Sequence, residues 1–182
     1  MADMTEPLKE AAPYIDGHLR HYVESNGADE AVYQDHTALG GHARTMHLVI
    51  RTLGRKSGLP RLAPLICKEV AKGDNGVAYI VIASKMGDDA HPLWFANMQA
   101  GGEVAAQVGS KRYRCAWRVA EGEERGRLWA EMETYYPPYA QYKAGTAREI
   151  PVVVLNPAGE IAEPFELRAG DGVNGGVAAL RS

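Results

Sequence analysis

The feature that most constrains the fold is a regular alternation of side chains over residues 111–119. Apolar or aromatic residues alternate with arginines along this segment: Tyr113, Cys115, Trp117 and Val119 against Arg112, Arg114 and Arg118. Successive side chains of a β-strand point to opposite faces, so these residues would form one apolar and one cationic face. A shift of one residue would bury the arginines. The segment is therefore predicted to be a strand whose register is well specified.

The rest of the chain predicts mainly strands, with a few helices. Apolar runs and turn residues place strands at residues 45–52, 62–70, 76–83, 103–108 and 150–155, and Gly73-Asp74-Asn75-Gly76 is typical of a hairpin turn. Helical spacing places helices at residues 14–24, begun by Pro13, and at residues 91–100 and 121–136. About six strands joined mostly by hairpin-sized turns predict a mostly β fold with flanking helices, in a closed or half-closed antiparallel barrel.

Composition argues against several functional classes. The net charge of −3 disfavours a general nucleic-acid binder, which is usually basic. Residues 1–10 contain no apolar run of the kind found in secretory signals, and no window approaches the roughly 18 apolar residues that cross a bilayer. Cys67 and Cys115 lack CxxC spacing, so we expect two buried thiols, and the histidines lack a metal-site pattern. The prediction is a cytoplasmic protein without a nucleic-acid partner, a stable membrane span or a metal.

A glycine-bounded turn between the first two long predicted strands gathers positive charge. It contains Arg55, Lys56 and Arg61, together with Ser57. Glycines allow a backbone to approach an anion closely, arginine offers a bidentate fork, and lysine offers a point charge. The turn is either a phosphate- or carboxylate-binding site or a solvated basic hairpin. A second turn, Ser84-Lys85, follows the strand at residues 76–83, and adjacent strands would bring Lys56 and Lys85 to one anion.

Two aromatic segments are candidates for a pocket wall. Trp94 lies on the predicted helix at residues 91–100 and either stacks on a planar ring or packs in the core, which is the commoner fate. Pro138 can begin a new turn, on which Tyr139 and Tyr142 would share one face. Tyrosine hydroxyls donate protons and hydrogen bonds, so this cluster is either a pocket wall or a surface aromatic patch.

Taken in order, these segments resemble the deazaflavin-dependent nitroreductase family, whose members are oxidoreductases linked to coenzyme F-420. The resemblance rests on the order and spacing of several motifs: Gly54-Arg55-Lys56-Ser57-Gly58, Pro60-Arg61, Pro64-Leu65, Val81-Ile82-Ala83-Ser84-Lys85, His91-Pro92-Leu93-Trp94, Tyr136-Pro137-Pro138-Tyr139-Ala140-Gln141-Tyr142 and Arg148-Glu149-Ile150-Pro151-Val152-Val153. We therefore expect an N-terminal helix and variable segment (1–44), a barrel (45–157) and a C-terminal extension (158–182), mobile from Ala169.

The resemblance implies a split β-barrel of the FMN-binding type that holds F-420, an 8-hydroxy-5-deazaflavin with a phosphate and a polyglutamyl tail. Carried over position by position, its cofactor-binding residues are Arg55, Lys56, Arg61 and Lys85 on the anionic tail, Ser57 and Ser84 as hydrogen-bonding partners, and Pro64 and Trp94 beside the ring. Asp88-Asp89 departs from the family pattern, which often has a basic or small residue there, and would weaken binding of an anionic tail.

The implied reaction is hydride transfer from the reduced deazaflavin to an electron-poor small molecule, which is a nitroaromatic, a quinone or an activated carbon–carbon double bond. Tyr136, Tyr139 and Tyr142 would line the acceptor side, with Tyr139 the first candidate proton donor and Tyr136 the second. The histidine-bearing region before Thr45 would shape the acceptor pocket. Two alternatives stay open, an FMN-dependent split-barrel reductase and a non-catalytic flavin or deazaflavin carrier, and a homodimer is a candidate assembly.

Overall fold

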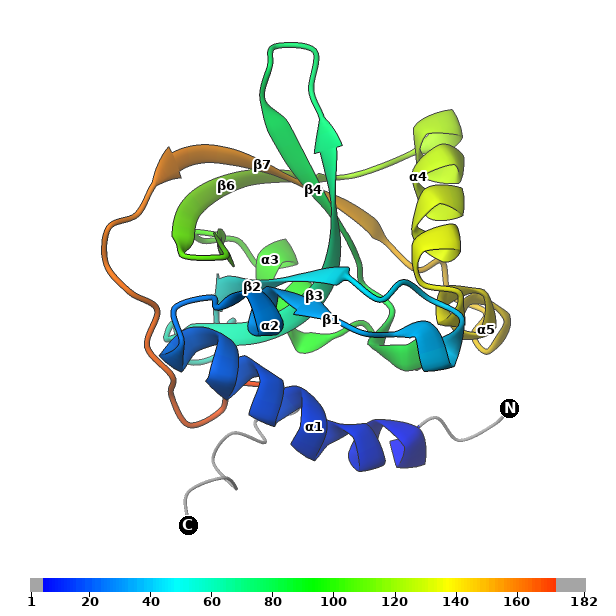
Figure 1. The fold of residues 1–182 in the computed structure, drawn as a ribbon, viewed down its shortest axis with the longest axis horizontal. Helices are drawn as coiled ribbons and strands as arrows, with labels where there is room; N and C mark the ends of the chain where they lie inside the picture. The colour runs from blue at the N-terminus through cyan, green and yellow to red at the C-terminus, as the bar shows by residue number, and fades with distance from the viewer. Residues whose placement is uncertain (1–4, 173–182) are drawn as a thin grey trace.

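The structure, a computed structural model, describes the backbone of residues 5–172 and the side chains of residues 14–172. Its described strands form one antiparallel sheet in the order β1-β2-β3-β4-β7-β6-β5, and a further pairing of β2 with β5 closes β2 to β7 into a barrel (Figure 1). The strands are β1 (Tyr33–Gln34), β2 (Thr45–Leu53), β3 (Pro60–Ala71), β4 (Val77–Ile82), β5 (Ala105–Val108), β6 (Lys111–Val119) and β7 (Val152–Glu160). The predicted mostly β split barrel with flanking helices is confirmed.

Strand β2 closes the barrel because it pairs along both of its edges, with β3 over residues 47–53 and with β5 over residues 49–51. Leu48 and Ile50 belong to the core inside the barrel, whereas Val49 packs outside it with Leu19 of α1. Both faces of β2 are thus covered. A strand covered on both faces carries a nearly continuous apolar run, which is why β2 alternates less regularly than β6.

Strand β6 has the two-faced character that its sequence predicts. Trp117 packs against the barrel core, while Arg114 and Arg118 point outward and form ion pairs with carboxylates at 2.8 and 2.6 Å. The predicted burial of the two thiols holds fully for Cys67 and in part for Cys115, which is half-buried. The alternation therefore fixes which face of this strand meets the core.

Helices cover the barrel on two sides (Figure 1). The helical segments are α1 (Thr5–Glu24), α2 (Asp29–Val32), η1 (Thr37–Leu39), η2 (Lys85–Gly87), α3 (Leu93–Gln99), α4 (Gly122–Tyr135) and α5 (Pro138–Ala144). Leu128, Trp129 and Met132 of α4 pack on outward side chains of β4 and β7, and α1 packs across β2 and β3. Within the described residues, no helix combines the length and the apolar character needed to span a membrane.

Two predicted helix starts are wrong. α1 begins at Thr5 and runs through Pro13. Pro7 lies in the first turn instead, where an amide N–H has no partner inside the helix and a proline costs little. α3 begins at Leu93 because Pro92 is extended (ψ 150°) and caps the helix, its carbonyl accepting the amide N–H of Phe95 at 3.1 Å.

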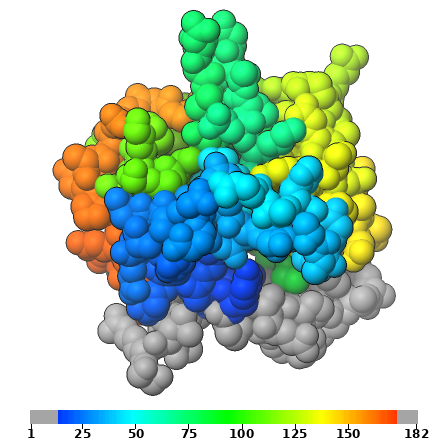
Figure 2. Space-filling model, in the orientation of Figure 1, coloured from blue at the N-terminus to red at the C-terminus, as the bar shows by residue number. Residues whose placement is uncertain are grey.

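The β3–β4 hairpin projects from the body of the molecule (Figures 1 and 2). Its tip is the predicted turn, in which the Lys72 amide donates to the Gly76 carbonyl at 2.8 Å and Asn75 adopts a left-handed φ of 62°. The turn predicted from residues 73–76 is therefore confirmed.

The segment that follows β7, residues 161–172, runs back along the barrel, and we call it the C-terminal strap. Ile161 and Phe165 are buried against α1 and β2, and the Gly172 amide donates to the carbonyl of Leu62 at 2.9 Å. The expectation of mobility from Ala169 is therefore wrong for residues 169–172, because hydrogen bonds to β3 hold them. Residues 173–182 lie outside the described residues.

Candidate functional site

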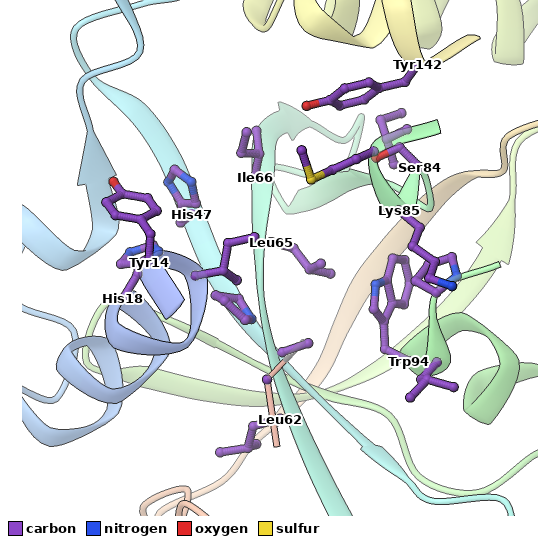
Figure 3. A pocket seen from close by; sticks show the side chains of 18 of the residues that line it. Tyr14, His18, His47, Leu62, Leu65, Ile66, Ser84, Lys85, Trp94 and Tyr142 are labelled. Atoms are coloured by element: carbon purple, nitrogen blue, oxygen red, sulfur yellow. The ribbon is translucent and has the colours of Figure 1, made fainter. Parts of the chain in front are cut away.

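A cavity of about 1400 Å³ opens between the β2–β3 turn, β3, η2, α3, α5 and α1 (Figure 3). Every residue predicted for the cofactor and the acceptor lines it: Arg55, Lys56, Ser57, Arg61, Pro64, Ser84, Lys85, Trp94, Tyr136, Tyr139 and Tyr142. In Figure 3, Lys85 and Trp94 lie on one side of β3, and His18 and His47 lie on the other. The segments that carry the resemblance thus meet in one place, while the role of each residue stays a prediction.

Sheet topology explains why Lys56 and Lys85 share this cavity. β2 and β4 both run antiparallel to β3, so the turn after β2 and the η2 turn after β4 leave the sheet at the same end. Each turn places one lysine at the cavity wall. Two cations that are 29 positions apart in sequence therefore face a common space.

The β2–β3 turn is fixed from α3 by Asn97. This side chain is 6% exposed, its Oδ1 accepts the amide N–H of Arg55 at 3.1 Å, and its Nδ2 donates to Thr52 Oγ1 at 3.2 Å. Within the described part of the chain, none of Arg55, Lys56 and Arg61 forms an ion pair. The turn presents positive charge to the cavity that no paired carboxylate cancels.

The η2 turn holds Lys85 in an uncommon backbone conformation. Lys85 and Met86 have φ values of 46° and 54°, in the left-handed region that non-glycine residues rarely occupy. Gly87 follows, and a Cβ added there would lie 2.9 Å from the carbonyl oxygen of Tyr142, so glycine permits the close packing of α5 on this turn. The Lys85 ammonium pairs with Asp88 at 3.3 Å. This pair supports the expectation that Asp88 competes with an anionic tail.

Arg148, which precedes β7, ties the η2 turn in place. Its guanidinium donates to the carbonyl oxygens of Asp88, Ser84 and Ala83 at 2.7, 2.8 and 3.1 Å, and lies 3.1 Å from Nδ1 of His91. One side chain therefore satisfies three carbonyl groups of the segment that carries Lys85. Because these bonds offset the cost of two left-handed residues, Arg148 is the main anchor of the turn.

Trp94 and β3 form an apolar wall of the cavity. Trp94 is 8% exposed and meets Phe95 edge-on, with ring centroids 5.9 Å apart. It also lines the cavity, together with Pro64 and Leu65 of β3. Most of the ring therefore packs in the barrel core and its remaining surface faces the cavity, while stacking on a planar ring stays a prediction.

Three tyrosines meet at the cavity, Tyr139 and Tyr142 from α5 and Tyr136 from the end of α4. Ring centroids are 5.1 Å apart for Tyr136 and Tyr139, 6.0 Å apart for Tyr139 and Tyr142, and 6.5 Å apart for Tyr136 and Tyr142. Burial raises the pKa of all three phenols, well above the usual range for Tyr139, because a phenolate is poorly solvated there. The cluster is a pocket wall whose members keep their protons.

Three histidines lie beside the tyrosines, where the His36 and Tyr136 rings meet edge-on with centroids 5.2 Å apart. Ring centroids are 4.8 Å apart for His18 and His47 and 5.5 Å apart for His36 and His47. Burial lowers the pKa of all three imidazoles, for His47 to about 3, so this histidine wall is uncharged near pH 7. The Nε2 atom of His36 is buried and has no hydrogen-bond partner among residues 14–172. No group of three or more His, Cys, Asp or Glu side chains among the described residues is placed to hold a metal ion.

Three kinds of residue at this site escape sequence reasoning. Asn97 lies one helical turn after Trp94 in a mainly apolar helix, which is a weak signal that it has a buried polar partner. Arg148 lies directly before an apolar strand but shows no sign of its target. Gly170 and Gly172 of the C-terminal strap also line the cavity, and their sequence carries no such information.

Comparison with known proteins links the chain to one group of enzymes. A sequence profile described as F420H(2)-dependent quinone reductase matches residues 25–157. An F420H(2)-dependent quinone reductase of Mycobacterium tuberculosis is 32% identical over 132 residues, which is 69% of this chain and 85% of that protein.

Solved structures give the same link. A structure described as an F420-H2 dependent reductase is similar with a TM-score of 0.51 and 37% identity, over 60% of this chain and 93% of that one. Another, described as a domain-swapped dimer, is similar with a TM-score of 0.53 and 31% identity, over 79% of this chain and 98% of that one.

Proposed function

The chain belongs to the F420H(2)-dependent quinone reductase family, an oxidoreductase family whose cofactor is coenzyme F-420, and from that premise we propose that it reduces a quinone-type acceptor. The observation that carries this proposal is the pairing, on one cavity, of uncancelled cations with an apolar aromatic wall. Nitroaromatics and activated carbon–carbon double bonds are further candidate acceptors. The cytoplasm is the proposed place of action.

The residues present fit the cofactor. F-420 needs cations for its phosphate and polyglutamyl tail and a flat apolar surface for its ring. The cations are Arg55, Lys56, Arg61 and Lys85, with the hydroxyls of Ser57 and Ser84 beside them. The flat apolar surface is provided by Trp94 and Pro64. All of these residues line a cavity of about 1400 Å³. We propose that residues 45–157 form the cofactor-binding unit and that residues 1–44 supply the acceptor side, with residues 158–182 as an extension.

The proposed chemistry divides between cofactor and protein. Reduced F-420, when bound, supplies the hydride. The protein excludes water with Trp94 and Leu65, and its tyrosines provide the proton that completes the reduction of an acceptor oxygen. Burial raises the pKa of the Tyr139 and Tyr136 phenols, so both are protonated and can donate a hydrogen bond to an acceptor oxygen. The same shift makes them weak acids, so complete proton transfer requires a basic oxyanion on the acceptor, with Tyr139 the first candidate donor and Tyr136 the second. The Tyr142 ring lies 6.5 Å from the Tyr136 ring, and Tyr142 is the third candidate of this cluster.

The acceptor side has the character of an apolar ligand site. Tyr14, Leu39 and Leu93 line the cavity and are 62%, 53% and 48% exposed, so the mouth is apolar. The wall behind it carries the uncharged His18 and His36. A neutral imidazole can still donate or accept one hydrogen bond, which suits a quinone carbonyl better than a charged substrate.

The test is a titration of the purified protein with oxidised F-420 and then with FMN, followed by fluorescence quenching at low and moderate salt. We expect selective binding of F-420, weakened by at least tenfold in a Lys56→Ala plus Lys85→Ala variant through loss of two charge-assisted contacts. A Lys72→Ala plus Lys111→Ala variant, which removes two exposed lysines outside the cavity, is the matched control.

Each other outcome has a defined meaning. Preference for FMN would favour the alternative of an FMN-dependent split-barrel reductase. Tight binding of F-420 without turnover of any quinone, nitroaromatic or activated alkene would favour a carrier. Binding of neither cofactor would refute the assignment.

A homodimer is the proposed assembly. The relative described as a domain-swapped dimer is 31% identical to this chain over most of its length. Light scattering coupled to size-exclusion chromatography tests this, and a monomer at all protein concentrations would refute it.

A further inference from the structure

The C-terminal strap (residues 161–172) is anchored to the barrel at its start. Its first residue, Ile161, donates its amide N–H to the Arg112 carbonyl at 2.8 Å and is 7% exposed. Phe165 is 4% exposed, and its ring lies 4.6 Å from the Arg51 guanidinium carbon. The burial of the Ile161 and Phe165 side chains thus holds the strap against the barrel before the strap reaches the cavity.

The far end of the strap is pinned to β3 by a buried carboxylate. Asp171 is 1% exposed, and its Oδ1 accepts the amide N–H of Leu62 at 2.9 Å. Its other oxygen accepts the amide N–H of Arg168, and the Gly172 amide donates to the Leu62 carbonyl at 2.9 Å. Leu62 therefore bonds to the strap through both of its backbone groups. A carboxylate this deeply buried is costly unless it is hydrogen-bonded, so these contacts fix the position of the strap.

The pinned strap meets Arg61, the residue next to Leu62. Arg61 Nη1 donates to the Ala169 carbonyl at 2.8 Å. Gly170 has φ +95°, and a Cβ added there would lie 3.0 Å from the Arg61 guanidinium carbon. A carbonyl partner orients a guanidinium without cancelling its charge. In the described structure Arg61 forms no ion pair, although the buried Asp171 carboxylate attracts it at longer range. Arg61, Gly170 and Gly172 all line the cavity.

We propose that the C-terminal strap is a positioning element of the cofactor site, in which Asp171 holds Ala169 and Gly170 so that the Arg61 guanidinium is oriented in advance toward the anionic tail of the deazaflavin. This inference rests on the proposed function. Asp171 is a positioning residue, since it acts through the strap backbone on Arg61. Fixing one long side chain in advance changes an affinity by about fivefold to tenfold.

The test compares two ligands and matched variants. F-420 carries the phosphate and the polyglutamyl tail, whereas 8-hydroxy-5-deazariboflavin has the same ring without them. Asp171→Asn removes one negative charge from the buried anchor. Glu166→Gln removes one from an exposed strap residue whose carboxylate forms an ion pair with Arg168 at 3.2 Å. We expect Asp171→Asn to weaken F-420 binding about fivefold to tenfold, with unchanged binding of the tail-less ring, and Glu166→Gln to change neither.

A double-mutant cycle with Arg61→Gln gives the decisive readout. If the strap acts through Arg61, adding Asp171→Asn to Arg61→Gln costs little further F-420 affinity. Gly170→Ala is the second variant, since its Cβ displaces the guanidinium and should give the same tail-specific loss without altering Asp171. Thermal unfolding of each variant shows that it is folded at the temperature of the titration.

Three results would overturn the inference: equal losses for both ligands, additive losses in the cycle, or no loss in either Asp171→Asn or Gly170→Ala. Each leaves the proposed function intact as long as the wild-type protein binds F-420. Failure of the wild-type protein to bind F-420 would instead refute the proposed function, so the two failures are distinguishable.

Discussion

Replacing Arg148 with alanine should release the η2 turn. The guanidinium makes three hydrogen bonds to carbonyl oxygens, at 2.7, 2.8 and 3.1 Å. Bonds from a charged donor contribute roughly 1.5–3 kcal/mol each, a gross loss of roughly 4–9 kcal/mol. Relaxation of the left-handed Lys85 and Met86 returns roughly 1–2 kcal/mol for each residue. The net loss of unfolding free energy for Arg148→Ala is therefore about 4 kcal/mol at the midpoints of these ranges.

Urea denaturation followed by tryptophan fluorescence measures this loss, and F-420 titration measures its effect on the site. We expect F-420 affinity to fall by about tenfold or more, because Ser84 and Lys85 no longer hold their positions. Arg148→Lys should give an intermediate result, since one ammonium cannot span three carbonyls. The control is Arg127→Ala, which removes an exposed ion pair and should cost under about 1 kcal/mol. An Arg148→Ala variant within about 1 kcal/mol of wild type, with unchanged affinity, would refute the reasoning.

Three further predictions concern neighbours of the site. Asp88→Asn should strengthen F-420 binding by about twofold to fivefold at low salt, because Lys85 loses the carboxylate that pairs with it at 3.3 Å. If the gain in affinity persists at high salt, its origin is not electrostatic. Asn97→Ala should destabilise the protein by about 1–3 kcal/mol and weaken F-420 binding, because the Arg55 amide loses its hydrogen-bond acceptor. Unfolding and binding measurements that show neither effect would exclude a role of Asn97 in fixing the β2–β3 turn. For His47, burial sets the folded-state pKa at about 3, below its unfolded value, so protonation favours the unfolded chain and stability falls as the pH drops below about 6.5. Between pH 7.5 and 5 the wild type should lose about 2 kcal/mol more unfolding free energy than His47→Gln, and parallel pH profiles of the two proteins would contradict the low pKa.

The strands are largely predictable from the sequence, because the period of two and the turn residues are local properties. β6 begins and ends where its alternation does. The end of β7 is not predictable in this way. This strand continues to Glu160 because that residue pairs with Tyr113 of β6, and such pairing depends on the closure of the whole barrel. Local patterns therefore locate strands, whereas their ends depend on distant partners.

The site is predictable only where its chemistry is carried by motifs. The cationic turn and Ser84-Lys85 are recognisable by charge and glycine content, and their convergence follows from antiparallel neighbours. The role of Arg148 depends on carbonyl groups about 60 positions earlier in the chain. The histidine wall requires α1 to pack on β2, and the strap acts mainly through backbone groups, which every sequence contains. These contacts leave no local pattern.

The cavity is bounded by parts of the chain that fold under different constraints. Its cationic wall is formed by the turns that follow β2 and β4. The register of these strands cannot shift without disturbing the core. Its opposite wall comes largely from residues 14–39, of which only the short β1 joins the sheet. Leu19 and Tyr22 of that stretch are buried against the sheet, but cavity-facing positions such as Tyr14 and Leu39 are exposed and can change without altering the strand ladder. Evolution can therefore change the wall formed by residues 14–39 while the cationic wall stays the same. A protein engineer could likewise replace that wall with the corresponding segment of a relative.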